Sequence, residues 1–197
     1  RVVTPARQEL EEVRDVARTL RGAGTLEPWD LAYYAEKLRE HRYAITQEEL
    51  RPYFPISRVL DGLFKLLERL FDIRIREIQG VETWHPDVRF FEIRAGEGDL
   101  RGQFYLDPFA RPNKRGGAWM DVCVNRLHTA TCDQIPCAYL VCNFSPPVGD
   151  QPSLLTHTEV LTLFHEFGHG LHHLLTQIDY PAVGGISGVP WDAVELP

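Results

Sequence analysis

The chain has 197 residues, 44% of them hydrophobic and 25% charged, with a net charge of −7 and a pI of about 5.6. This balance is ordinary for a soluble globular protein, and its mild acidity argues against nucleic acid or an anionic membrane as the main partner. The sequence has no run of about 18 uncharged apolar residues, so it predicts no transmembrane helix.

The first 72 residues are predicted to be helical. Apolar residues recur at helical spacing over 4–21, 29–42 and 56–71. A capping box at Thr46 and Glu49 predicts a short helix that stops at Pro52. None of these helices carries residues at a catalytic spacing. Because the chain starts at Arg1 without an initiator Met, and stops soon after its most informative motif, we expect a piece of a longer protein.

The pattern changes after residue 72. Alternating apolar and charged residues at 73–78 predict a half-buried strand, while 88–93 and 103–106 flank a turn-rich segment that predicts a hairpin. Two further strand-like runs cover 118–124 and 138–144. The sequence therefore predicts an α+β fold, with a helical region at 1–72 and a mixed region at 73–197 that is truncated at its C-terminus.

The cysteines give no sign of a cysteine-rich metal site. None of the four forms a C-x-x-C pair, and their spacings do not match common zinc motifs. We interpret them as buried, reduced thiols of a cytoplasmic protein. They are Cys123, Cys132, Cys137 and Cys142.

One segment, Thr156–Thr176, carries a catalytic pattern. Its apolar residues follow the helical period, and Thr156 with Glu159 forms a capping box that predicts a helix start near 157. The predicted buried face of this helix consists of Val160, Leu163, Phe164, Phe167, Leu171, Leu174 and Leu175. Two mid-helix glycines at 168 and 170 weaken a helix, so we expect close packing there.

The same helix contains the H-E-x-x-H sequence, His165 to His169. Residues four apart share a helical face, so His165 and His169 can direct two imidazoles at one metal ion. The Glu166 carboxylate, one residue further round, can reach a water at that ion without being its ligand. Five-residue matches also arise by chance, and the apolar helix is what favours a hydrolytic site here.

A third ligand has two kinds of candidate. His172 and His173 lie two turns from His165, about 11 Å along the helix. We therefore interpret them as a partly exposed pair or as residues that donate hydrogen bonds to the metal ligands. Glu195 follows a Gly-rich turn and lies on a predicted second helix that begins at Pro190. Its alternative interpretation is a surface glutamate. The metzincin pattern is excluded, since it requires Gly at 172 and His at 175.

These motifs resemble the thimet oligopeptidase family of zinc metallopeptidases. The resemblance covers nearly the whole chain and rests on FHEFGHGLHH, SGVPWDAVELP, WHPDVRFFEI, FYLDPFARPNKRGGAWMD and AYLVCNF. It implies a zincin-like catalytic core, which is a small mixed sheet plus the H-E-x-x-H helix, within a larger and mainly helical protein. The remainder of such a protein, which carries further substrate-binding residues, is not in this chain.

The resemblance also implies a ligand set and an activity. One Zn²⁺ per chain would be bound by His165, His169 and Glu195, with Glu166 as general base. Short peptides would be cut at internal bonds by a soluble, cytoplasmic enzyme. By order of strands, residues 117–122 form the edge strand that pairs with substrate in such folds, so Gly117 and Ala118 are expected to contact it.

Two other functions stay open on the sequence. A His₂Glu site could pin two helices in a structural or zinc-binding module without activity, although structural zinc sites are usually closed, four-coordinate and rich in cysteine. A zinc aminopeptidase shares H-E-x-x-H, but it would bring acidic residues for the free amine of its substrate, and the sequence identifies none. The sequence predicts no oligomeric state.

Overall fold

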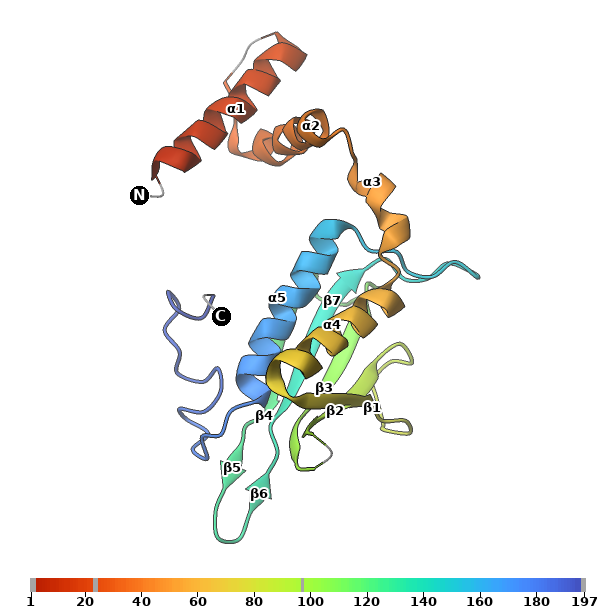
Figure 1. Ribbon diagram of the computed structural model, residues 1–197, viewed down its shortest axis with the longest axis vertical. Helices are drawn as coiled ribbons and strands as arrows, with labels where there is room; N and C mark the ends of the chain where they lie inside the picture. Colours follow the sequence, from red (N-terminus) through yellow and green to blue (C-terminus); the bar gives the residue numbers. More distant parts are fainter. Residues whose placement is uncertain (1–2, 23–24, 97, 196–197) are drawn as a thin grey trace. The chain divides into compact units, whose positions relative to one another are not determined.

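The computed structural model describes residues 3–22, 25–96 and 98–195 (Figure 1). The chain divides into two compact units, residues 1–50 and residues 51–197. In the part of the chain that is described, no helix combines the length and the hydropathy that crossing a bilayer requires.

The first unit is helical, as predicted. It contains α1 (Val3–Arg21), the 3-10 turn η1 (Pro28–Asp30), α2 (Leu31–Tyr43) and α3 (Gln47–Leu50). Val13 of α1 and Tyr34 of α2 are buried. The predicted capping box forms at the start of α3, where the backbone N–H of Thr46 donates to the Glu49 carboxylate at 2.7 Å. The N–H of Glu49 donates back to the Thr46 hydroxyl at 3.2 Å.

The second unit is built on a five-stranded mixed sheet with the order β1-β2-β3-β7-β4. Its strands are β1 (Ile73–Glu77), β2 (Arg89–Ala95), β3 (Leu100–Phe109), β4 (Trp119–Val124) and β7 (Cys137–Phe144). Neighbouring strands are antiparallel except β3 and β7, which are parallel. The predicted hairpin and the α+β class are confirmed. A second, two-stranded sheet of β5 (Leu127–His128) and β6 (Asp133–Gln134) was not predicted.

Two helices cover one face of the large sheet, α4 (Ile56–Phe71) and α5 (His157–Leu174) (Figure 1). The α4 side chains Val59, Leu60, Leu63 and Leu67 are buried in the same core as the strands. The second unit therefore begins at Arg51, before the change of composition at residue 72. The change of composition marks where the strands begin, whereas the packing of α4 on the sheet determines where the second unit begins.

Helix α5 is seated closely on the sheet. Phe167 is 1% exposed and its ring lies 5.2 Å from that of Phe104 on β3. A Cβ added at Gly170 would lie 3.0 Å from Leu140 Cδ2 on β7, so the close packing predicted for the mid-helix glycines is confirmed at this one. The predicted buried face was wrong for Phe164, which is 37% exposed because it lies on the flank of the helix away from the sheet.

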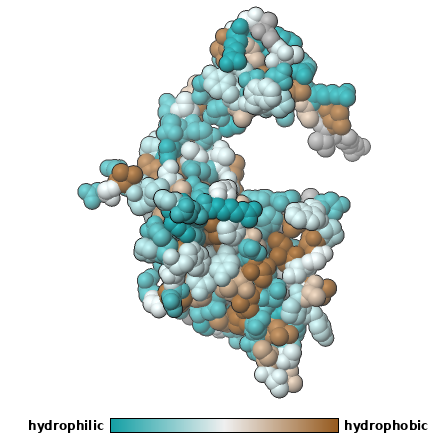
Figure 2. Space-filling model, turned by 180° about the vertical axis from the view of Figure 1, so that it is seen from behind, coloured by the Kyte–Doolittle hydropathy of each residue, from teal (hydrophilic) through white to brown (hydrophobic). Residues whose placement is uncertain are grey.

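The other face of the sheet carries aromatic residues. Trp84, in the β1–β2 connection, packs on Tyr105 of β3 and Tyr139 of β7, with ring centroids 5.2 and 5.5 Å away. Figure 2 views the chain from the side opposite to Figure 1, and hydrophobic residues gather there over the second unit. The two faces therefore differ: one is covered by α4 and α5, and the other is an aromatic surface that we call the open face.

Two glycines test the seating of the helices. Gly102 on β3 has no room for a side chain, since an added Cβ would lie 2.8 Å from Leu174 Cβ at the end of α5. We expect Gly102→Ala to lower the free energy of unfolding by about 1–3 kcal/mol through overpacking. Gly62 on α4 has nothing within 4 Å of an added Cβ, and Gly62→Ala should raise stability by about 1 kcal/mol. Urea unfolding of both variants measures these shifts, and equal shifts would contradict the packing described.

Candidate active site

The two histidines of the H-E-x-x-H sequence lie one turn apart on α5. The helix begins with the predicted capping box, in which the Thr156 hydroxyl accepts from the N–H of Glu159 at 3.1 Å. His165 Nε2 and His169 Nε2 are 3.1 Å apart. The His169 side chain is 10% exposed and that of His165 is 47% exposed. The His169 imidazole is therefore mostly buried, whereas the His165 imidazole is exposed at the surface.

Glu195 meets both histidines from the C-terminal segment. Its Oε2 lies 3.0 Å from His165 Nε2 and 3.4 Å from His169 Nε2. Within the described residues these three side chains form a group whose potential ligand atoms all lie within 4.8 Å of one another. The predicted pair His172 and His173 is not part of this group. The structure thus brings together the three residues that the sequence singled out, although they are up to 30 positions apart.

The predicted second helix does not form over the described residues. Residues 191–195 are a turn, in which the N–H groups of Ala193 and Val194 both donate to Pro190 O. Glu195 therefore approaches the histidines from a single turn; residues 196 and 197 lie outside the described part of the chain.

A Gly-rich connection lets the chain return to α5, as predicted. Gly185 has φ +60 and lies against His173, where an added Cβ would be 2.8 Å from Nδ1. His173 itself is fully buried, contrary to the expected partial exposure, and its Nε2 lies 3.0 Å from Val124 O on β4. Burial lowers the pKa of His173. This histidine ties the helix to the sheet and does not face the ligand group.

Glu166 lies beside the ligand group but is not part of it. The residue is 8% exposed, so its carboxylate is largely removed from bulk water. Burial raises the pKa of Glu166, while the charges of His165 and His169 and a hydrogen bond from the Met120 backbone lower it. A buried carboxylate next to a candidate metal centre is suited to accepting and releasing a proton.

A groove of about 540 Å³ opens over these side chains. Strand β4 forms one wall, the C-terminal segment the other, and α5 the floor. On these walls only Ala118 and Glu195 were predicted as site residues; the residues missed are Trp119, Met120, Ile186, Val189, Trp191 and Val194. Trp119 and Met120 lie in the strand that was predicted. Gly117 precedes β4 and is not among the lining residues.

Strand β4 lies at the edge of the sheet, as expected for residues 117–122. It is antiparallel to β7, with Trp119 opposite Val141 and Val122 opposite Ala138. Among the described strands of this sheet β7 is its sole neighbour, so the other backbone edge of β4 is available for pairing. Whether Gly117 and Ala118 contact a substrate stays a prediction.

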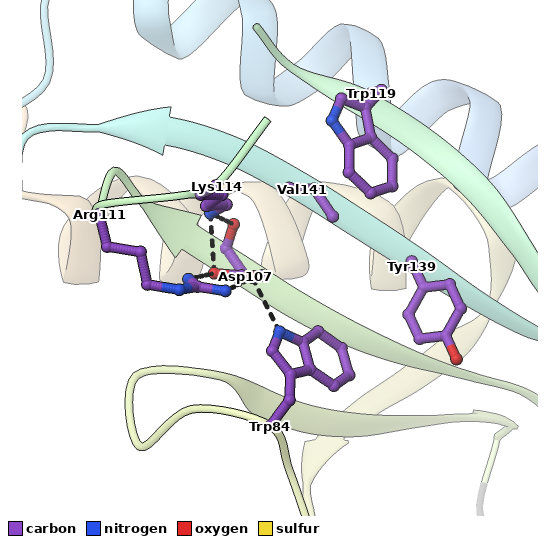
Figure 3. A pocket seen from close by; sticks show the side chains of 7 residues that line it. All are labelled: Trp84, Asp107, Arg111, Lys114, Trp119, Tyr139 and Val141. Carbon is purple, nitrogen blue, oxygen red and sulfur yellow. Dashed lines mark hydrogen bonds and ion pairs between the residues drawn. The ribbon is translucent and has the colours of Figure 1, made fainter. Parts of the chain in front are cut away.

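A buried ion cluster fixes the loop that leads into β4. Asp107 is 2% exposed at the end of β3 and receives both terminal nitrogens of Arg111, at 2.7 and 2.8 Å. Lys114 Nζ donates to Asp107 Oδ1 at 2.8 Å, and Trp84 Nε1 donates to Oδ2 at 3.1 Å (Figure 3). Burial alone raises the pKa of this carboxyl, but the hydrogen bonds outweigh burial and lower the pKa to about 2.

Comparison with known proteins shows the family to which the chain belongs. The family model described as "Peptidase family M3" matches residues 1–197. The chain belongs to peptidase family M3. It is 56% identical to oligopeptidase A of Escherichia coli over 96% of its own length, and 46% identical to an organellar oligopeptidase A of Arabidopsis thaliana, also over 96%. A dipeptidyl carboxypeptidase of Salmonella typhimurium is 41% identical over the whole chain.

The M3 relatives are much longer than this chain. The chain spans 28% of the Escherichia coli oligopeptidase A, 25% of the Arabidopsis protein and 29% of the dipeptidyl carboxypeptidase. The 197 residues thus correspond to between a quarter and a third of the length of these M3 relatives.

The pKa of Asp107 predicts a pH-dependent stability. Its folded value of about 2 lies below the ordinary value of 3.8, so its ionised form stabilises the fold above about pH 4, and this contribution is lost as the pH falls through about 2. The shift corresponds to about 2 kcal/mol. Between about pH 6 and pH 3 we expect the wild type to lose about 1 kcal/mol relative to Asp107→Asn.

Urea unfolding of both proteins across this pH range measures the difference. Asp61→Asn is the matched control, because Asp61 is exposed on α4 and pairs only with Lys65 in the described structure. A gap between wild type and Asp107→Asn that is constant with pH would contradict the assigned pKa.

Proposed function

We propose that this chain forms the zinc-binding centre of an oligopeptidase, which hydrolyses internal bonds of short peptides with one Zn²⁺ per chain. The observation that carries the proposal is the convergence of His165, His169 and Glu195 beside the buried carboxylate of Glu166. Membership of family M3 and the names of the relatives support a peptidase. The identity to oligopeptidase A, 56% against 41% for the dipeptidyl carboxypeptidase, supports cleavage at internal bonds.

The donor set fits zinc. Zinc binds imidazole nitrogen at about 2.0–2.1 Å and carboxylate oxygen at about 2.0–2.2 Å, so ligand atoms of a tetrahedral site lie about 3.4 Å from one another. The separations here are 3.0, 3.1 and 3.4 Å. Three protein ligands are also the number that leaves a zinc ion with an open position for chemistry.

Each residue of the centre has a distinct role in the proposed hydrolysis. His165, His169 and Glu195 hold the ion, which, when bound, polarises a peptide carbonyl and makes water more acidic. Glu166 accepts a proton from the attacking water on its carboxylate and delivers it to the nitrogen of the leaving amine. The backbone of β4 binds the peptide as an added strand, with Gly117 and Ala118 at its start.

The same observations bear on the alternatives. A structural module would close the ion with a fourth protein ligand, usually cysteine. The group of candidate ligands found among the described residues has three members and contains no cysteine, which favours the enzyme.

We further propose that residues 73–197 belong to a zincin-like core completed by the rest of a longer polypeptide. The four cysteines are free, which supports a cytoplasmic location, although only Cys137 and Cys142 are buried as predicted, whereas Cys123 is half-buried and Cys132 is exposed.

Replacing the proposed base separates chemistry from metal binding. We expect Glu166→Gln to retain one zinc per chain and to lower kcat by about 10²–10⁴-fold, because the amide cannot take the proton. Cleavage of an internally quenched short peptide, measured beside zinc content, is the readout. Glu159→Gln on the same helix is the control, since its amide oxygen can still accept from the Thr156 N–H in the capping box and the ligand group is left intact. Turnover that survives in Glu166→Gln would remove Glu166 from the role of base.

Replacing the third ligand tests the metal centre. We expect Glu195→Gln to weaken zinc binding by more than about 100-fold. The loss of a residue that only hydrogen-bonds to a ligand already lowers metal affinity by about 10–100-fold, and the loss of the ligand itself should lower it further. Competition with a chelator measures the affinity. Asp192→Asn, on the same turn, should leave it unchanged. X-ray absorption of the bound zinc in the wild type should give three protein ligands and a water, whereas four protein ligands would favour the structural module.

A further inference from the structure

We infer that Asn143 positions the substrate-pairing strand β4, by holding the Gly116–Gly117 turn that precedes it. The inference rests on the proposed function, because it concerns how β4 is aligned with the ligand group and with Glu166. Asn143 lies near the end of β7, and its side chain is half-buried. It is not a member of the candidate ligand group and is not among the residues that line the groove.

The side-chain amide of Asn143 replaces backbone pairing where the sheet ends. The β4–β7 ladder starts at Trp119 opposite Val141, and continuing this register by two residues places Gly117 opposite Asn143. There the amide nitrogen of Asn143 donates to Gly117 O at 2.6 Å and to Arg115 O at 2.8 Å. One side chain thus ties two carbonyls of the turn to the strand beside it.

The backbone of the turn explains why such a tie is needed. Gly117 has φ +85, in the left-handed region, so the chain bends at this residue and leaves the extended conformation of a strand. Regular pairing with β7 therefore stops, and the carbonyls of the turn need other donors. Glycine itself is conformationally permissive, so the turn depends on external contacts for its geometry.

The preceding part of the loop is held by Lys114. This side chain is 5% exposed, and its Nζ donates to Phe109 O at 2.7 Å and to Cys142 O at 2.6 Å, in addition to Asp107 (Figure 3). Cys142 and Asn143 are neighbours on β7, so two successive residues of one strand bind the loop. The Asp107 cluster anchors the loop, and Asn143 sets its last turn before β4.

The position of β4 matters for the proposed chemistry. Ala118, Trp119 and Met120 form the strand wall of the groove, and the Met120 backbone reaches the Glu166 carboxylate. A peptide that pairs with β4 takes its register from that strand. A displacement of about 1 Å can cost about 100-fold in rate. Loss of Asn143 should therefore impair the placement of the peptide while leaving the zinc ligands, all on other elements, in place.

The test compares Asn143→Asp with Asn143→Gln. Aspartate has the same shape but presents an oxygen to both carbonyls, so it repels the turn, whereas glutamine keeps the donor and should restore part of the function. Arg89→Gln is the matched control: it also removes two side-chain hydrogen bonds, those to Glu77, at the opposite side of the sheet. Each variant is made in the 197-residue chain and in a chimera, in which this chain replaces the matching segment of Escherichia coli oligopeptidase A.

Four readouts of the site, together with two measurements of folding, separate positioning from folding. Zinc content and the inhibition constant of acetohydroxamate, a small chelator that does not need β4, should be unchanged in Asn143→Asp. The inhibition constant of a peptide phosphinate that pairs with β4 should rise, and kcat/KM for the quenched peptide should fall by about 10–100-fold. Circular dichroism and urea unfolding verify that the variant is folded; if it is not, the comparison is made between Asn143→Gln and Asn143→Ala.

The outcomes distinguish the inference from the function on which it rests. If the unsubstituted chimera binds no zinc or cleaves no peptide, the proposed function fails. If it does both, and the Asn143 variants bind the phosphinate as tightly as the wild type, the inference is overturned. Equal losses for the phosphinate and for acetohydroxamate would also overturn it, because they would indicate general disruption of the centre.

Discussion

The close seating of α5 on the sheet is the constraint on which the rest of the second unit depends. Gly170 lets the helix approach Leu140 on β7, and Gly102 lets β3 approach Leu174 at the end of the helix. Phe167, in the middle of H-E-x-x-H, enters the aromatic core with Phe104. Because an inward-facing residue at the middle position fixes the rotation of the helix, the two histidines on either side of it are turned toward β4 and the groove.

The carboxylates of Asp107 and Glu166 lie in different electrostatic environments. On the open face the Asp107 carboxylate is buried with its cations and is fully hydrogen-bonded, an arrangement that fixes loop geometry and offers little for chemistry. On the groove side Glu166 is buried without a cation of comparable strength, so its pKa is raised. A carboxylate that must exchange protons needs the second environment, and one that must hold a loop needs the first.

Local signals in the sequence predicted local features, and long-range packing decided the others. The capping boxes at Thr46 and Thr156 each depend on residues three apart, and both formed. The exposure of Phe164 and the turn at 191–195 were missed, because helical periodicity does not show how wide the covered face of a helix is or whether a short segment nucleates. The hydrogen bonds from Asn143 to Gly117 and Arg115 join residues 26 and 28 positions apart, and no local pattern in the sequence predicts them. The proximity of His165, His169 and Glu195 followed from the H-E-x-x-H spacing and from the family resemblance, and the structure places their candidate ligand atoms within 4.8 Å of one another; that they bind zinc stays a prediction.

The three proposed ligands are supported very unequally by the fold. His169 is held inside a helix that the sheet fixes, whereas Glu195 is 63% exposed and comes from a single turn with two hydrogen bonds to Pro190. All three candidate ligand atoms already lie within 3.4 Å of one another, so a bound metal ion would mainly fix the exposed Glu195 side chain against the two histidines. The C-terminal segment forms one wall of the groove. Glu195 thus belongs both to the candidate ligand group and to this wall, whereas the loop before β4, on the other side of the groove, is held by Asn143 and Lys114 without any contribution from the ligand group.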